Sequence, residues 1–376
     1  MTLIHHEGFE AFKTSLGIQQ YYPNIATLMG ADTHENIFNA SVRFVAGTIQ
    51  GTEIKICSDG ALPFKFVHRV PININIIVGF RLKIDPAGSF GVGSGIYFYN
   101  ETVNDYLSKF LFVNDDANNF HFTVVNKIGT TLATTGVITK GVYHYIEVAL
   151  TFSTDPASNQ ITIKSDEVIL FNGSNKDTNP NDLAGTDILS WTCPLYGDVD
   201  TEPSMHLDDI YIIKWQEGFY NNTFLGSCIV ELSLPSSAKA TGGDPGSVQQ
   251  WTPSSGTNHE ALVDDPNEHD GDTTYVTATA ANLVELNSMV NLSAITGNIL
   301  GVRQVAFARL TSVGSRNLRL KYKEPGGEVI NAADVALTST TYVPITLIRE
   351  EVAAATPRVF SVNDINNGEF GFETRP

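Results

Sequence analysis

The feature that most constrains this fold is a two-residue alternation of apolar and polar side chains, repeated in many short runs. Residues 76–84 place an aliphatic or aromatic side chain at every second position, with Arg81 and Lys83 among the residues between. Residues 142–152 repeat the pattern, with Glu147 on the polar side. Because successive side chains of a strand point to opposite faces, each run predicts a strand with one buried and one wet face.

The first half of the chain consists mostly of such runs, separated by clusters of turn-forming residues. Polar turns rich in Asp, Asn, Pro and Gly occupy 85–88, 114–119 and 155–159, and only 9–21 has a faintly helical pattern. Many strands at this spacing are typical of an antiparallel sandwich or jelly roll. The further predicted strands are 48–56, 95–99, 109–113, 120–127, 160–164, 167–171 and 207–214.

The character of the sequence changes after residue 215. A long loop rich in Pro, Gly and Asp spans 234–272, and such a loop is uncommon in a compact domain unless it is functional or serves assembly. Ser361, with Asp364 three residues later, predicts a capped helix over 361–367, followed by a final strand at 369–373. Strand signals precede them at 302–310, 317–323, 335–337, 342–349 and 359–360.

Length and strand pattern together predict an all-β protein of two domains. A chain of 376 residues fits two domains, since a domain typically holds about 100–200 residues. We place the boundary near 215–224, which gives domains at 1–215 and 216–376. The second domain is the smaller and carries the long loop at 234–272.

Charge and cysteine content exclude several classes of function. Lys and Arg number 23 against 41 Asp and Glu, a net charge of −18, so we expect no nucleic-acid partner, since that binding relies on basic residues. The three cysteines are widely spaced and predict neither a disulfide framework nor a zinc site. The amino terminus lacks the pattern of a secretory signal, and no run approaches the ~20 apolar residues needed to span a bilayer, so we expect no membrane insertion.

Acidic residues on the predicted strands are the candidates for catalytic groups. Glucanases on β-sandwiches place acidic residues at alternate positions of one strand, as in Glu-x-Asp-x-x-Glu, and this string is absent here. The nearest strand carboxylates are Glu147, which stands alone, and the adjacent pair Asp208 and Asp209, which point to opposite faces. The sequence therefore predicts no enzyme, no catalytic residues and no cofactor.

Loops rich in Asp and Asn are candidates for binding. Asp115 and Asp116 lie in the turn at 114–119 and are the predicted contacts to a glycan. Carboxylates crowd the acidic stretch 264–272, where calcium would find oxygen ligands, but without EF-hand spacing a solvated loop is favoured and no metal is expected. The weak calcium candidates are Asp264, Asp265, Asp270 and Asp272.

Short motifs in both halves are similar to proteins of tailed bacteriophages. Residues 7–10 (EGFE), 77–82 (IVGFRL) and 207–212 (LDDIYI) resemble the concanavalin A-like lectin/glucanase, or LamG-like, jelly rolls found in phage structural proteins. The second half is similar to a small β-sandwich module that often follows that jelly roll in phage proteins. Its matching segments are 251–258 (WTPSSGTN), 272–276 (DTTYV) and 362–372 (VNDINNGEFGF).

The resemblance implies a concanavalin A-like jelly-roll sandwich followed by a smaller antiparallel β-sandwich. It further implies a non-enzymatic structural protein on the exterior of the virion, assembled in the host cytoplasm, either a capsid decoration subunit or part of the tail. The expected partners are other virion proteins or a second copy of the chain. Trp251, Pro253 and Tyr275 are the predicted partner-binding residues, since aromatic anchors dominate interfaces. The alternative is an adhesion protein of the tail or head fibre that binds host glycans.

Overall fold

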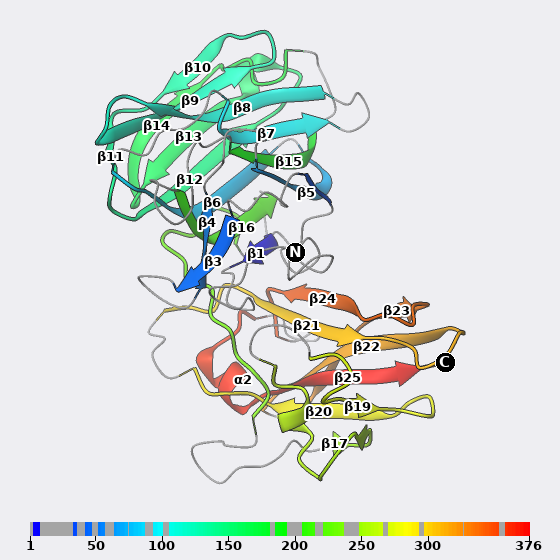
Figure 1. Cartoon of the computed structure of the whole chain (residues 1–376). Coiled ribbons are helices and arrows are strands. Elements are labelled where there is room, and N and C mark those ends of the chain that lie inside the picture. Colours follow the sequence, from blue (N-terminus) through cyan, green and yellow to red (C-terminus); the bar gives the residue numbers. More distant parts are fainter. Residues whose placement is uncertain are drawn as a thin grey trace. The chain divides into compact units, whose positions relative to one another are not determined.

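The computed structural model divides the chain into two compact units, residues 2–231 and 232–376 (Figure 1). The division falls later than the boundary expected after residue 215, because residues 221–231 pack with the first unit. The structure describes residues 3–7, 33–35, 42–46, 52–56, 64–73, 75–86, 93–100, 105–180, 185–193, 205–214, 221–236, 248–265, 270–292, 297–325, 327–352 and 358–376.

The first unit contains two antiparallel eight-stranded sheets. The first sheet has the order β14-β13-β12-β6-β16-β4-β3, and β1 also pairs with β16. Its strands are β1 (Leu3–Glu7), β3 (Val42–Ala46), β4 (Thr52–Ile56), β6 (Asn75–Ile84), β12 (His144–Thr151), β13 (Gln160–Ser165), β14 (Val168–Ser174) and β16 (Met205–Lys214).

The second sheet of this unit has the order β10-β9-β8-β7-β15-β5-β2, with β11 paired to β9. A short 3-10 helix, η3 (Pro156–Ser158), joins β12 and β13 of the first sheet. The strands of the second sheet are β2 (Thr33–Glu35), β5 (Phe64–Asn73), β7 (Gly95–Asn100), β8 (Asp105–Asn114), β9 (Asn119–Asn126), β10 (Thr131–Thr134), β11 (Ile138–Thr139) and β15 (Thr186–Cys193).

The core of the first unit lies between these two sheets. The expected inward set of β6 is fully buried, and Phe80 of that strand contacts Phe112 of β8, with ring centroids 6.3 Å apart. Phe98 of β7 packs on Phe152 in the same way, at 5.4 Å. The alternation along β6 and β8 thus faces two apolar surfaces toward each other, and their removal from water stabilises the sandwich.

The outer face of the first sheet departs from the sequence expectation. Ile77 and Glu147 were expected on a wet face, yet they are 4% and 1% exposed. Residues 221–231, which form no helix or strand and which we call the strap, run over this face. The expectation was wrong here because the alternation of a strand reports which side chains share a face but not whether a distant segment covers that face.

The second unit is built on a five-stranded antiparallel sheet of order β17-β20-β25-β22-β23. Two further strand pairs, β18–β19 and β21–β24, and the 3-10 helix η4 (Glu260–Leu262) complete it. The strands are β17 (Val248–Gln249), β18 (Thr252–Pro253), β19 (Val276–Thr277), β20 (Val284–Ser288), β21 (Val302–Ala308), β22 (Arg316–Lys323), β23 (Val329–Leu337), β24 (Val343–Arg349) and β25 (Glu369–Arg375).

The predicted capped helix is confirmed as α2 (Val362–Asn367). The Ser361 side chain accepts from the Asp364 amide, and the Asp364 carboxylate accepts from the Ser361 amide, which completes a capping box. The final strand β25 follows directly. The helix could be predicted from the sequence because a capping box depends on residues only three positions apart.

No helix among the described residues has the length and apolarity needed to cross a membrane. The described residues are almost entirely strand, turn and loop, which confirms the all-β class predicted from the alternation.

Candidate functional site

Three tyrosines and a lysine form a cluster on the outer face of the second sheet in the first unit. Tyr97 and Tyr99 belong to β7, and Tyr106 and Lys109 belong to β8. Their neighbours Phe98 and Phe110 point the other way and are fully buried in the core. Alternation therefore places Tyr97, Tyr99 and Lys109 outward, and all four residues of the cluster are half-buried. We call them the tyrosine–lysine cluster.

Strand register brings the members of this cluster together. Tyr97 lies directly opposite Lys109, and a register shift between Phe98 and Tyr99 places Tyr106 opposite Tyr99. Such a bulge changes the direction of a side chain, and here it adds Tyr106 to the face that already carries Lys109. The rings of Tyr97 and Tyr99 are nearly parallel, 16° apart, with centroids separated by 6.2 Å.

Lys109 places its ammonium over two of the rings. The Nζ atom lies 4.0 Å from the ring centroid of Tyr106 and 4.7 Å from that of Tyr97. Tyr106 in turn meets Tyr97 edge-on, at 6.1 Å and 72°. A cation over an aromatic face is attracted by the quadrupole of the ring, so the four side chains hold one another in place.

The ammonium of Lys109 has no carboxylate partner within the part of the chain that the structure describes. Its neighbour Lys127 differs, because it pairs with Asp105 at the start of β8. The hydrogen bond from Lys127 lowers the pKa of the Asp105 carboxyl below its ordinary value, so this carboxyl is ionised at neutral pH. Lys109 is therefore the cation of this face that no acid in those residues neutralises.

This arrangement suits a sugar. The faces of aromatic rings pack against the C–H groups of a pyranose, phenol hydroxyls exchange hydrogen bonds with sugar hydroxyls, and an ammonium binds an acidic group. The cluster was not singled out from the sequence. The available signal was Tyr97-x-Tyr99 on the polar side of the predicted strand 95–99, where two exposed aromatic side chains are unexpected.

The predicted glycan contacts Asp115 and Asp116 occupy the exposed turn between β8 and β9. Asp115 pairs with His121 at 2.8 Å. Asp116 accepts from Asn119 and from the Asn118 amide, and these hydrogen bonds lower the pKa of its carboxyl. Both carboxylates thus organise their own turn. They lie six residues or more along β8 from Lys109, roughly 20 Å in a strand, so the structure does not join them to the cluster.

The carboxylates Glu147 and Asp209 lie beneath the strap on the first sheet. Glu147 accepts hydrogen bonds from the Tyr211 hydroxyl and, at 2.9 Å, from the Gly226 amide. Asp209 accepts from the Val230 amide at 2.8 Å and pairs with Arg81 at 2.7 Å. These acids therefore fasten the strap.

The pair Asp208 and Asp209 lies within β16, at a register shift between Asp208 and Tyr211, rather than at the end of the strand. Asp209 has a φ of 48°, a left-handed conformation that is uncommon for a residue with a side chain. Burial raises the pKa of its carboxyl, against the opposing effects of the Val230 amide and Arg81. Because the strand bulges here, the simple rule that adjacent residues face opposite sides does not describe this pair.

Described carboxylates of the acidic stretch form hydrogen bonds and ion pairs with residues of the second unit. Asp272 pairs with Arg309 at 2.7 Å, and the Arg309 hydrogen bond lowers the pKa of its carboxyl. Asp270 accepts from the amide and hydroxyl of Thr274, and Asp265 accepts from the Asp270 amide. Asp264 is half-buried. Among the described residues no group of three or more His, Cys, Asp or Glu is arranged to hold a metal ion.

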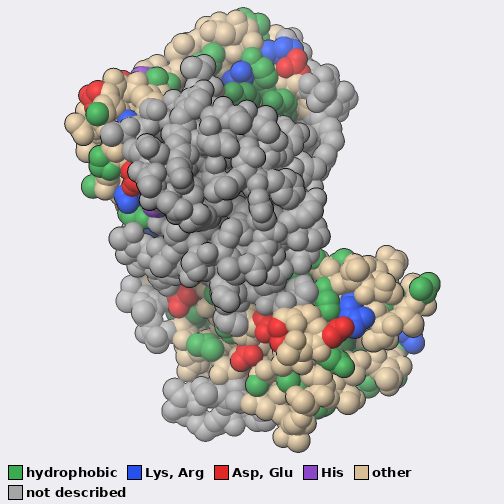
Figure 2. All heavy atoms as spheres, in the orientation of Figure 1, with side chains coloured by type: hydrophobic (Ala, Val, Ile, Leu, Met, Phe, Trp, Pro, Cys, Tyr) green, Lys and Arg blue, Asp and Glu red, His purple; other side chains and the backbone are tan. Residues whose placement is uncertain are grey.

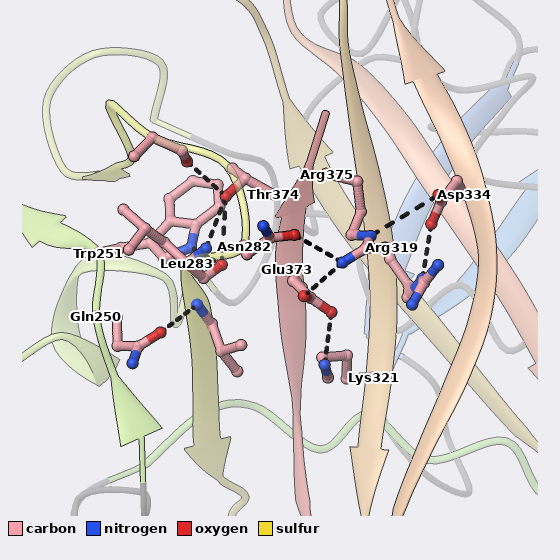
Figure 3. Close-up of polar contacts among 12 residues, drawn as sticks. Gln250, Trp251, Asn282, Leu283, Arg319, Lys321, Asp334, Glu373, Thr374 and Arg375 are labelled. Atoms are coloured by element: carbon pink, nitrogen blue, oxygen red, sulfur yellow. Dashed lines mark hydrogen bonds and ion pairs between the residues drawn. The ribbon is translucent and has the colours of Figure 1, made fainter.

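The three predicted partner-binding residues have different environments. Trp251 belongs to the core of the second unit, where its ring meets Phe372 edge-on at 4.8 Å and its Nε1 donates to the Leu283 carbonyl (Figure 3). Pro253 is half-buried in β18. Tyr275 is 37% exposed and remains available to a partner. Trp251, which the sequence singled out for partner binding, thus packs within the second unit.

The outer face of the five-stranded sheet carries a chain of ion pairs. Figure 3 shows Glu373 between Lys321, at 2.6 Å, and Arg375, at 3.1 Å. Asp334 follows, paired with Arg319 at 2.6 Å. In the view of Figure 2, basic and acidic side chains of the second unit lie next to one another in the same way. A shallow depression of about 380 Å³ on this face is lined by Val248, Val284, Leu286, Lys321, Lys323, Val329 and Asn331.

Comparison with known proteins gives structural matches only. No family model matches the chain, and no curated protein sequence matches it. A mutant of the alginate lyase Aly36B in complex with alginate tetrasaccharide is 12% identical, with a TM-score of 0.40, over 56% of this chain and 96% of that one. The catalytic domain of a glycoside hydrolase family 131 protein from Coprinopsis cinerea is 11% identical, with a TM-score of 0.36, over 58% and 95%.

A third similar structure is the endo-1,3-beta-glucanase from Streptomyces sioyaensis, 12% identical with a TM-score of 0.34, over 56% of this chain and 95% of that one. The chain is an all-β protein whose first unit is a sandwich of two antiparallel sheets, the fold class that its sequence predicted. At these identities and TM-scores the likeness carries no activity over to this chain.

These matches correct one expectation. The sequence predicted that the chain is not an enzyme, because it lacks the acidic string of the glucanases, but the similar structures are enzymes, an alginate lyase among them. The absence of one local motif is a poor criterion for the absence of catalysis, since catalytic groups are often assembled from different strands.

Proposed function

We propose that the first unit binds carbohydrate at the tyrosine–lysine cluster. The observation that carries the proposal is the position of Lys109, whose ammonium lies over the rings of Tyr97 and Tyr106 on the outer side of a sheet. The inward aromatics of the same strands, such as Phe98 and Phe110, have no exposed surface. Three half-buried tyrosines opposite that core offer aromatic surface to a sugar. The hydroxyls of Tyr97 and Tyr106 donate to backbone carbonyls, and their oxygens can still accept from sugar hydroxyls.

We propose a particle of a tailed bacteriophage as the setting of this binding, with virion proteins as partners. The support is the similarity of short motifs in both halves of the sequence to phage jelly rolls and to the module that follows them. On this proposal the second unit attaches the chain to the particle, and the first recognises glycans on the host surface.

A structural subunit of the virion is the second candidate function. The observation that favours it is β23, which lies at the edge of the five-stranded sheet with Val329 and Val335 each 40% exposed. Exposed edge strands pair readily with other chains. Purified particles separate the two candidates by copy number, because a decoration subunit is present in hundreds of copies and a tail adhesin in few.

The binding proposal is tested on a glycan array with the full-length chain and three variants. Tyr97→Ala and Tyr106→Ala remove ring faces from the cluster, and we expect each to lower binding at least tenfold. Tyr275→Ala is the matched control, because it removes an exposed tyrosine from the second unit. Bound glycans are then incubated with the protein and analysed for shortened or unsaturated products, which measures whether binding is followed by cleavage. Equal binding by all variants would refute the assignment of the site.

A further inference from the structure

We infer that the glycan bound at the tyrosine–lysine cluster is acidic, with a carboxylate or sulfate group that contacts Lys109. This inference rests on the proposed function and adds the chemical class of the ligand. Lys109 alone among the four residues carries a charge, and no acid among the described residues neutralises it.

Lys109 differs from Lys127 in that it has aromatic rings and, among the described residues, no carboxylate as its partner. The sequence carries a net charge of −18, and Lys127, directly after the strand β9 that pairs with β8, has Asp105 as its ion-pair partner. A half-buried ammonium without an anion has lost part of its hydration, and the two rings replace only some of it. An anionic ligand therefore gains more at Lys109 than at a fully hydrated or already paired lysine.

The geometry also places the Lys109 ammonium next to the proposed sugar-binding surface. Lys109 lies opposite Tyr97 in register, and its ammonium is held over the rings of Tyr97 and Tyr106, beside the surface where a sugar would pack. A sugar stacked on the tyrosines brings its acidic substituent into reach of Nζ without rearrangement of the strands. A neutral sugar on the same rings would leave the ammonium without an anion, and binding would lose that contribution.

Pairs of ligands that differ only in charge test the inference. Hexasaccharides of galacturonate, mannuronate and glucuronate are compared with their carboxyl-reduced, neutral counterparts by isothermal titration calorimetry. We expect at least one acidic member to bind about tenfold more tightly than its neutral partner, since a charge-assisted hydrogen bond has roughly that effect. The preference should weaken as salt rises, because half-buried charges are partly screened.

Variants of the chain assign the preference to Lys109. Lys109→Met keeps the aliphatic stem and should abolish the acidic preference, Lys109→Arg should retain it, and Lys127→Met, which removes the lysine paired with Asp105, should leave it unchanged. Circular dichroism confirms that each variant is folded. Equal affinity for acidic and neutral ligands, or a preference that survives Lys109→Met, would overturn the inference while glycan binding stands. Failure of every acidic and neutral glycan to bind would overturn the proposed function as well.

Discussion

Gly79 of β6 and Tyr211 of β16 lie opposite each other in register, and the ring of Tyr211 lies directly over the α-carbon of Gly79. A Cβ atom built on Gly79 would lie 2.1 Å from the ring. The absence of a side chain at Gly79 thus lets the ring lie against the sheet, with its hydroxyl bonded to Glu147 below the strap. The lack of a side chain at Gly79 thus permits polar contacts that hold the strap at Gly226, which lies 147 positions later in the chain.

Substitution of this glycine should destabilise the first unit. In Gly79→Ala the new methyl group overlaps the Tyr211 ring, and overpacking of this kind typically costs about 1–3 kcal/mol. Urea denaturation measures the change in the free energy of unfolding. Gly136→Ala is the control, since a Cβ there has nothing within 4 Å, and it should change that free energy little.

Removal of the Glu147 carboxylate should loosen the strap. Glu147→Ala leaves the Tyr211 hydroxyl and the Gly226 amide without their acceptor, at a cost of about 1–3 kcal/mol. Cys228, in the strap, reports the change, because burial raises the pKa of its thiol to about 12 and keeps it slow to react.

The measurement is the rate at which a thiol reagent labels Cys228 in a chain that also carries Cys57→Ser and Cys193→Ser. Glu147→Ala should raise this rate severalfold. Glu328→Ala, at an exposed turn, should not. Unchanged labelling in Glu147→Ala would mean that the carboxylate does not fasten the strap.

Acid should weaken the second unit through Glu373. Burial alone would raise the pKa of this carboxyl, but the hydrogen bond and charge of Lys321, aided by Arg375, hold it below the ordinary value of 4.5. A pKa lowered on folding gives stability that is complete above about pH 4.5 and is lost as the pH falls through the folded value. Glu373→Gln should therefore lower the thermal midpoint at pH 7 and flatten its decline below pH 5, whereas Glu328→Gln should follow the unmodified chain.

Loss of the α2 cap should lower the free energy of unfolding by a predictable amount. Ser361→Ala removes the acceptor for the Asp364 amide, and substitutions of this kind lower stability by about 0.5–2 kcal/mol. Ser361→Asn, which also caps helices, should restore most of it. Equal stability of the unmodified chain and Ser361→Ala in urea would contradict a stabilising capping box.

Features that depend on near neighbours in the sequence were predictable. Alternation located β6 and β12 and named the inward residues of β6, and the spacing of Ser361 and Asp364 located α2. Features that depend on distant segments were not. The strap, about 80 residues later in the chain, covers Glu147, and no local sequence pattern predicts this contact.

The same distinction explains the site. Tyr97 and Lys109 are joined by the register of β7 and β8, and Tyr106 joins them only through a bulge, which alternation alone does not predict. Asp115 and Asp116 attracted attention because carboxylates in a loop are conspicuous, but their partners are His121 of the adjoining strand β9 and Asn119. Trp251 was conspicuous because it is an aromatic residue in a long loop, but its side chain packs against a core.

The most direct test of the central claim is the affinity of the double variant Tyr97→Ala, Tyr106→Ala for a glycan that the unmodified chain binds, measured by calorimetry with folding verified by circular dichroism. Recognition by the tyrosine–lysine cluster predicts that this folded variant loses binding by about a hundredfold or more, the product of two roughly tenfold losses if they are additive. An unchanged dissociation constant in the folded double variant would contradict it.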